Sequence, residues 1–216
     1  KLNNKITSLT KSNNNWDYFK LIHQAESIIN KTPIKLKGGI LPRNNPTNAK
    51  GVLIYDIESD SENQNDFLHG FLRIKINSAQ NLDIKNSTYI PFLILKKDEE
   101  NKVLINLIKF VNSHKGWPIL HYGETEYFSL KKIFKLTSNN EDRFITLKDD
   151  LIDVHKLLIS QWILPIQHYG LKNVANWLGF YWSQKNMEGS RALFWWRQWQ
   201  TINDTQKKNS NNLSKI

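Results

Sequence analysis

The feature that most constrains this chain is an apolar stretch that ends in acidic side chains. Residues 51–59, GVLIYDIES, are rich in strand-forming residues and turn acidic at their end, the pattern of a buried strand. Side chains alternate along a strand, so Asp56 and Glu58 should project to one side, about 6–7 Å apart. Two such oxygen ligands can hold Mg²⁺ or Mn²⁺ and activate water. The alternative is a solvated strand end.

The order of apolar patterns predicts an α/β fold with a mixed sheet, because three strands precede an alternation of helix and strand. Pro91 favours an edge position or a strand start for the third strand. The predicted strands are residues 51–59, 67–76, 87–95, 117–123 and 144–147. The predicted helices are residues 16–30, 96–116, 124–136, 149–160, 171–180 and 190–200.

The first 50 residues read as a lead-in to this domain. After the helix at 16–30, residues 31–51 are rich in Pro, Gly and Asn, which predicts an extended linker. We therefore divide the chain into a lead-in, residues 1–50, and a domain, residues 51–216.

Further acids stand where other predicted strands give way to helices. Carboxylates favour helix amino termini in any case, by capping and by the helix dipole. In an α/β sheet, however, functional groups gather beyond one edge, and acids from separate strands can converge there on a pair of cations. These acids are Glu124, Glu126, Asp149, Asp150 and Asp153.

Composition narrows the function classes. The chain has no cysteine, which excludes disulfides, thiolate metal sites and cysteine nucleophiles within these residues. No apolar run approaches the ~20 residues that span a bilayer, and we expect a cytoplasmic protein without a membrane partner.

The net charge of +10 lies in the flanks, because residues 51–200 carry 18 basic and 17 acidic side chains. Basic flanks fit a nucleic-acid partner; a compositional drift towards Lys and Asn is the alternative.

Several strings together resemble a known family. LIYDIES, HYGETEYFSLKKI, DDLIDVHKLL and LPIQHYGLKNVANWLGFYW are similar to the YprB-type ribonuclease H-like exonuclease domain, a relative of the DEDD proofreading exonucleases. The resemblance covers roughly residues 35–200, and ILPIQHYGLKNVANWLGF is its most specific run. It implies a ribonuclease H-like mixed sheet flanked by helices. Residues 21–26 and 40–46 resemble the connector that joins this domain to an upstream PD-(D/E)xK nuclease domain in RecB-like nucleases.

The resemblance also implies roles for individual residues. Asp56 and Glu58 match the first metal-binding motif, Glu126 matches the acid after the family's His-Tyr motif, and Asp150 matches the Asp-Leu that opens the next element. These four would act as catalytic residues and as ligands of two Mg²⁺ or Mn²⁺ ions. Contacts to substrate would come from His121, Tyr122 and Lys172.

The family's last ligand is an Asp that closely follows a Tyr-Asn pair. This sequence stops at Ile216 before such residues, and Asp204 lacks their context, so we expect a domain truncated at its carboxyl end. The function implied is 3′-to-5′ exonucleolytic hydrolysis of single-stranded DNA or RNA ends by a two-metal mechanism. The alternative is a catalytically incomplete module of the same fold that binds nucleic acid through its basic flanks and aromatic surfaces.

Overall fold

The computed structural model describes residues 15–36, 49–63, 65–136, 147–182 and 189–202. The chain divides into two compact units, one of residues 1–42 and 155–181 and the other of residues 43–154 and 182–216. We call these the helical unit and the sheet unit and describe each by itself. No helix among the described residues is long and apolar enough to cross a membrane.

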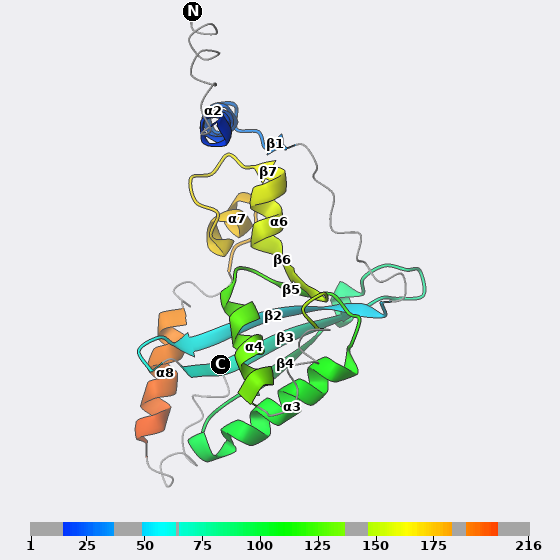
Figure 1. The fold of residues 1–216 in the computed structure, drawn as a ribbon, viewed down its shortest axis with the longest axis vertical. Coiled ribbons are helices and arrows are strands. Elements are labelled where there is room, and N and C mark those ends of the chain that lie inside the picture. Colours follow the sequence, from blue (N-terminus) through cyan, green and yellow to red (C-terminus); the bar gives the residue numbers. More distant parts are fainter. Residues whose placement is uncertain (1–14, 37–48, 64, 137–146, 183–188, 203–216) are drawn as a thin grey trace, which may run out of the picture. The chain divides into compact units, whose positions relative to one another are not determined.

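A five-stranded mixed sheet forms the centre of the sheet unit (Figure 1). The strand order is β4-β3-β2-β5-β6; β2, β3 and β4 pair antiparallel, while β5 and β6 run parallel to β2. The mixed α/β sheet predicted from the sequence is confirmed. The strands are β2 Gly51–Asp60, β3 Asn65–Lys75, β4 Thr88–Leu93, β5 Ile119–His121 and β6 Leu151–Asp153.

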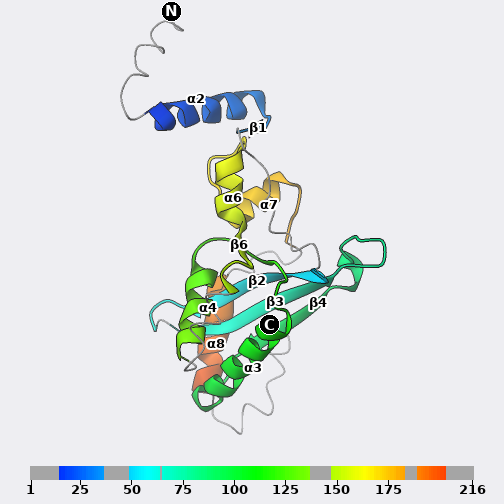
Figure 2. The same cartoon turned by 45° about the vertical axis from the view of Figure 1, so that its right-hand side comes forward.

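Helices cover both faces of this sheet (Figure 2). Helices α3 (Glu100–Ser113) and α4 (Thr125–Leu136) share one apolar core with the sheet, which includes the fully buried Leu53, Leu107 and Phe134. Helix α8 (Gly189–Thr201) lies on the other face. Two short 3₁₀ helices, Ile84–Asn86 and Lys97–Glu99, complete the described elements of this unit.

Strand β2 shows the alternation that the sequence predicts. Leu53 and Tyr55 point into the core beneath α3 and α4, with 0% and 2% of their surface exposed. Ile54, the residue between them, faces the other way and is 39% exposed. Asp56 therefore lies on the side opposite to Tyr55.

Helix α8 uses its aromatic side chains mainly for packing. Trp196 stacks on Phe67 with ring centroids 4.9 Å apart, and its indole N–H donates to the carbonyl of Ile94 at 2.9 Å. Ala192 is buried against the same cluster. Phe194, by contrast, is 56% exposed.

An ion pair ties α8 to the end of β2. The Arg197 guanidinium donates to both carboxylate oxygens of Asp60, at 2.6 and 3.0 Å, and to Glu62 at 2.7 Å. The Asp60 side chain is fully buried, whereas that of Glu62 is 75% exposed. The hydrogen bonds from Arg197, supported by Asn63, hold the pKa of Asp60 well below its usual range.

The helical unit consists of the lead-in helix and the segment after β6. Its elements are α2 Asn15–Asn30, β1 Ile34–Lys35, α6 Val154–Gln161, β7 Trp162–Ile163 and α7 Leu171–Trp177. Strands β1 and β7 pair antiparallel. Gln24 donates to the carbonyls of Leu164 and Ile166 at 2.8 and 3.0 Å, and the Tyr169 hydroxyl donates to Gln24 at 3.1 Å. The helix predicted at 16–30 is confirmed, and it packs against a segment far along the chain.

One segment folds differently from its prediction. The strand expected at 144–147 lies mostly outside the described residues, and the helix expected at 149–160 begins only at Val154. Leu151–Asp153 is instead the edge strand β6, paired with β5. The apolar spacing that indicated a helix is equally compatible with a short strand followed by a helix. Residues 37–48 of the linker predicted at 31–51 also lie outside the described residues, while Ile34–Lys35 within it forms the short strand β1.

Replacement of Asp60 by Asn should lower the thermal midpoint by several degrees at neutral pH, because the charge that binds Arg197 is lost. A carboxyl whose pKa is lowered by folding stabilises the fold above its unfolded pKa of about 4, and this contribution disappears as the pH falls. The midpoint difference between wild type and variant should therefore shrink from about pH 7 to about pH 3, measured by circular dichroism.

Glu62→Gln is the matched control, because Glu62 binds the same guanidinium from an exposed position. It should change the midpoint much less. Equal losses in the two variants, or a difference that does not change with pH, would contradict the stabilising role of the Asp60–Arg197 ion pair.

Candidate active site

The register of the parallel strands brings acids from three elements to one edge of the sheet. Ile54 pairs with Leu120, and His121 pairs with Asp153. Asp153 is thus level with Tyr55, and Asp56 stands one residue further along the same direction. Glu126 lies in the first turn of α4, which follows β5. This edge, beyond the carboxyl ends of the parallel strands, is where α/β sheets bind ligands.

Glu126 lies in an unfavourable position for a negative charge. Its side chain is largely buried, and its Oε2 atom has no hydrogen-bond partner among the described residues. Burial is the main cause that raises the pKa of Glu126, and the charges of Asp56, Asp153 and Asp66 raise it further. Loss of hydration also raises the pKa of Asp56. Glu126 is therefore within reach of the charges of Asp56, Asp153 and Asp66.

Asp153 is held in place by the turn after β5. The backbone N–H of Gly123 donates to its Oδ1 atom at 3.2 Å. Gly123 has a φ of +112°, in the region that favours glycine. The charge of Asp153 contributes to the raised pKa of Tyr122, after burial. Asp153 thus joins the edge that Glu126 and Asp56 share.

Glu58 lies two residues after Asp56 on β2, so the strand alternation places both on one side. Burial raises the pKa of Tyr89, and the charges of Asp56 and Glu58 raise it further. The Glu58 Oε2 atom is 2.9 Å from the point that a Cβ on Gly189 would occupy. Gly189 is the first residue of α8. Glu58 therefore faces the amino end of α8, where a carboxylate is favourable.

Tyr89 is a site residue that the sequence analysis missed. A Cβ on Gly70 would lie 2.6 Å from the Tyr89 hydroxyl oxygen, so this phenol rests directly on Gly70. Gly70 is the β3 partner of Asp56. Burial raises the pKa of Tyr89, followed by the charges of Asp56 and Glu58, so the hydroxyl keeps its proton. The only sequence signal was a glycine in a strand interior, which often marks a close approach.

A buried polar network lies beneath the acids, on the core side of β2. The Tyr55 hydroxyl and His69 Nδ1 are 3.0 Å apart, and Tyr55 also bonds to Ser129. The Ser129 hydroxyl donates to Asp66 at 2.6 Å. Burial lowers the pKa of His69 to about 4 and raises that of Tyr55. The network joins β2, β3 and α4 and fixes the helix that carries Glu126.

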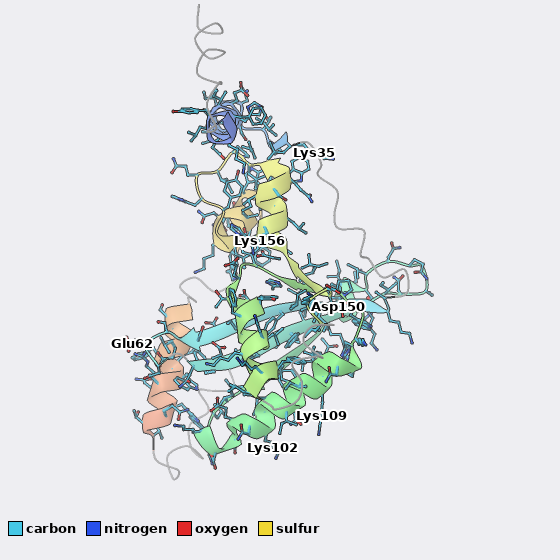
Figure 3. The ribbon with its side chains drawn as sticks, viewed as in Figure 1. Lys35, Glu62, Lys102, Lys109, Asp150 and Lys156 are labelled. Carbon is cyan, nitrogen blue, oxygen red and sulfur yellow. The ribbon has the colours of Figure 1, made fainter. Side chains whose placement is uncertain are left out.

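The structure does not bring Asp150 to this edge. Asp150 precedes β6, its carbonyl accepts the N–H of Ile119, and its carboxylate accepts the N–H of Gly116 at 2.8 Å. Both bonds lie at the amino ends of β5 and β6. Figure 3 shows Asp150 at the end of the sheet away from Glu62. The reason is the position of β6: Asp150 comes just before the strand, and Asp153 ends it.

The predicted substrate-binding residues fall in different surroundings. His121 is 4% exposed, and its Nδ1–H donates to the carbonyl of Gly123 at 2.7 Å, which suits a role in holding the turn. Tyr122 is half-buried beside Asp153. Lys172 lies in the first turn of α7, in the helical unit.

The ligand atoms available at this edge are of the type that a hard divalent cation binds. Asp56, Glu126 and Asp153 supply only carboxylate oxygens, the donors that Mg²⁺ and Mn²⁺ take. The buried Oε2 atom of Glu126 is an acceptor that lacks a donor among the described residues. As the side chains stand, no group of three or more possible ligands is gathered closely enough to hold an ion within the described part of the chain.

Comparison with known proteins agrees with this fold. A family model described as the RNase_H superfamily (RNase_H_2) matches residues 53–212, well over half of the chain. The chain therefore belongs to the RNase H superfamily. No curated protein and no solved structure matches it. Membership confirms the ribonuclease H-like fold and points to nuclease activity and nucleic-acid binding; RNase H-like nucleases generally use divalent metal ions.

Asp56→Asn should lower the pKa of Glu126 in metal-free buffer, because it removes a neighbouring negative charge. The pKa is measured from the pH titration of the Glu126 side-chain carboxyl resonance in carbon-13 NMR spectra. Asp149→Asn is the control: Asp149 acts on Asp150 and not on Glu126. A Glu126 pKa that shifts equally in both variants, or in neither, would show that the acids do not share one edge.

Proposed function

We propose that the sheet unit hydrolyses phosphodiester bonds of nucleic acid at the edge formed by Asp56, Glu126 and Asp153, with Mg²⁺ or Mn²⁺. One observation carries the proposal: Glu126 is buried beside Asp56 and Asp153, and its Oε2 atom has no hydrogen-bond partner among the described residues. Such crowding destabilises the folded protein unless a cation compensates it. The superfamily membership supports the same reaction class.

The position of each side chain suggests its role in the proposed reaction. Asp56, Glu126 and Asp153 would hold cations, which when bound neutralise the phosphodiester and lower the pKa of the attacking water. Tyr89 keeps its proton beside Asp56 and can donate a hydrogen bond to a phosphate oxygen. Glu58 faces the amino end of α8 and would act as a further ligand or orient that helix. We further propose that the site binds two metal ions and degrades the strand from its 3′ end. Only the family resemblance supports these two details.

The second candidate is a module that binds nucleic acid without cutting it. It is favoured by the absence, within the described residues, of three ligands already gathered around one point. The two candidates differ in one observable, since only the nuclease shortens a labelled oligonucleotide when Mn²⁺ is added.

Asp56→Asn, Glu126→Gln and Asp153→Asn should each reduce Mn²⁺-dependent cleavage by roughly 100-fold or more, a loss of about 2.7 kcal/mol in transition-state stabilisation. Asp150→Asn is the matched control and should keep wild-type cleavage, because Asp150 lies at the opposite edge. Cleavage is followed on gels with a 5′-labelled single strand. Loss of activity in Asp150→Asn with retention in Asp153→Asn would reverse the assignment, and a wild type that binds but never cleaves would favour the module.

Tyr89→Phe should slow cleavage by about tenfold, because it removes one hydrogen-bond donor to phosphate and little packing. Circular dichroism checks that the fold is kept. Tyr181→Phe, a phenol that is 74% exposed in the helical unit, is the control. Equal rates for Tyr89→Phe and wild type would exclude Tyr89 from the reaction.

A further inference from the structure

A polar pocket opens at the end of the sheet away from Asp56 and Glu126. Its volume is about 620 Å³. Lys50 leads into β2, Lys75 ends β3, and Trp117 lies just before β5, so the pocket lies at the amino end of the central strand. The loop after β3 adds the amides of Asn77 and Gln80.

The walls of this pocket are fixed by local packing. A Cβ on Gly51 would lie 2.3 Å from a ring carbon of Trp117 and 2.4 Å from the carbonyl oxygen of Ile74, so only glycine lets the indole lie against β2. The Asn77 side-chain oxygen accepts the N–H groups of Ala79 and Asn81, both at 3.0 Å. This leaves the amide nitrogen of Asn77 as a donor.

The pocket is lined by two lysines and by no acidic residue of the described chain. Neither Lys50 nor Lys75 forms an ion pair with another described residue. Asp83, whose N–H bonds to the Lys75 carbonyl, has its carboxylate engaged by Asn86 at 2.9 and 3.0 Å. The Asp150 carboxylate accepts the Gly116 N–H. Two ammonium groups, amide donors and an indole are the groups that bind a phosphate and stack on a base.

We infer that this pocket binds a nucleotide of a single-stranded nucleic acid, at a distance from the point of cleavage; the inference rests on the proposed function. Lys50 and Asp56 are six residues apart on an extended chain, which is about 20 Å. Stacked nucleotides that advance about 3.4 Å each would cover this span in about six steps. A nucleic-acid strand that is long enough to reach the pocket should therefore bind more tightly, because it contacts a site separate from the acids.

The test uses the double variant Lys50→Gln/Lys75→Gln and a control with the same charge change, Lys102→Gln/Lys109→Gln. The control lysines are exposed on α3 (Figure 3). Fluorescein-labelled single strands of DNA and of RNA are titrated with each protein in EDTA at several salt concentrations, and binding is followed by fluorescence anisotropy. Circular dichroism checks the fold of each variant.

The pocket variant should bind at least one of the two strands about tenfold more weakly than wild type. The slope of log K against log salt should fall in size by about 1.4, because each lysine that no longer pairs with a phosphate lowers it by about 0.7. The control should bind within about twofold of wild type. Equal weakening in both double variants, or none in the pocket variant with either strand, would overturn the inference. Binding in EDTA needs no hydrolysis, so a wild type that fails to cleave with Mn²⁺ would refute the proposed function separately.

Discussion

The parallel pairing of β5 and β6 alongside β2 is the constraint on which the rest of this structure depends. Leu53 pairs with Ile119, and Ile119 pairs with Leu151, so the carboxyl ends of three adjacent strands meet at one edge. A shift of one residue in this register would turn every side chain of a strand to the other face. The same backbone bonds that complete the sheet therefore decide which acids meet.

The repulsion among the acids at this edge lowers the stability of the folded protein. Packing and hydrogen bonds in the surrounding structure offset this loss. Glu126 is buried among like charges, with one oxygen that has no partner among the described residues. Beneath it, Tyr55 and His69 stay neutral and bond to each other, which avoids a further charge in the core. At the carboxyl end of β2, the ion pair between Asp60 and Arg197 ties α8 to the sheet. The acids are thus held by a rigid frame, as a site prepared for cations requires.

The sequence was informative wherever one periodicity dominated. The alternation in 51–59 predicted β2 and the shared side of Asp56 and Glu58, and the helical spacing predicted α2, α3, α4 and α8. It failed for residues 147–153, where a three-residue strand is too short to show a period and runs directly into a helix. Asp153 was consequently placed at a helix start, while the choice of Asp150 as a ligand came from the family resemblance. Tyr89 could not be found because its approach to Asp56 depends on pairing between β3 and β4, which no local pattern encodes.

The two ends of the central strand β2 carry opposite charges. Carboxylates lie at its carboxyl end, and Lys50 and Lys75 lie at its amino end. This polarity would orient a polyanionic strand, its phosphates drawn to the basic end and its reactive bond to the acidic end. The most direct test is an anomalous difference map from crystals grown with Mn²⁺. The account predicts manganese within about 2–2.6 Å of carboxylate oxygens of Asp56, Glu126 and Asp153. Manganese bound at Asp150 instead, or none at the edge shared by the three acids, would contradict it.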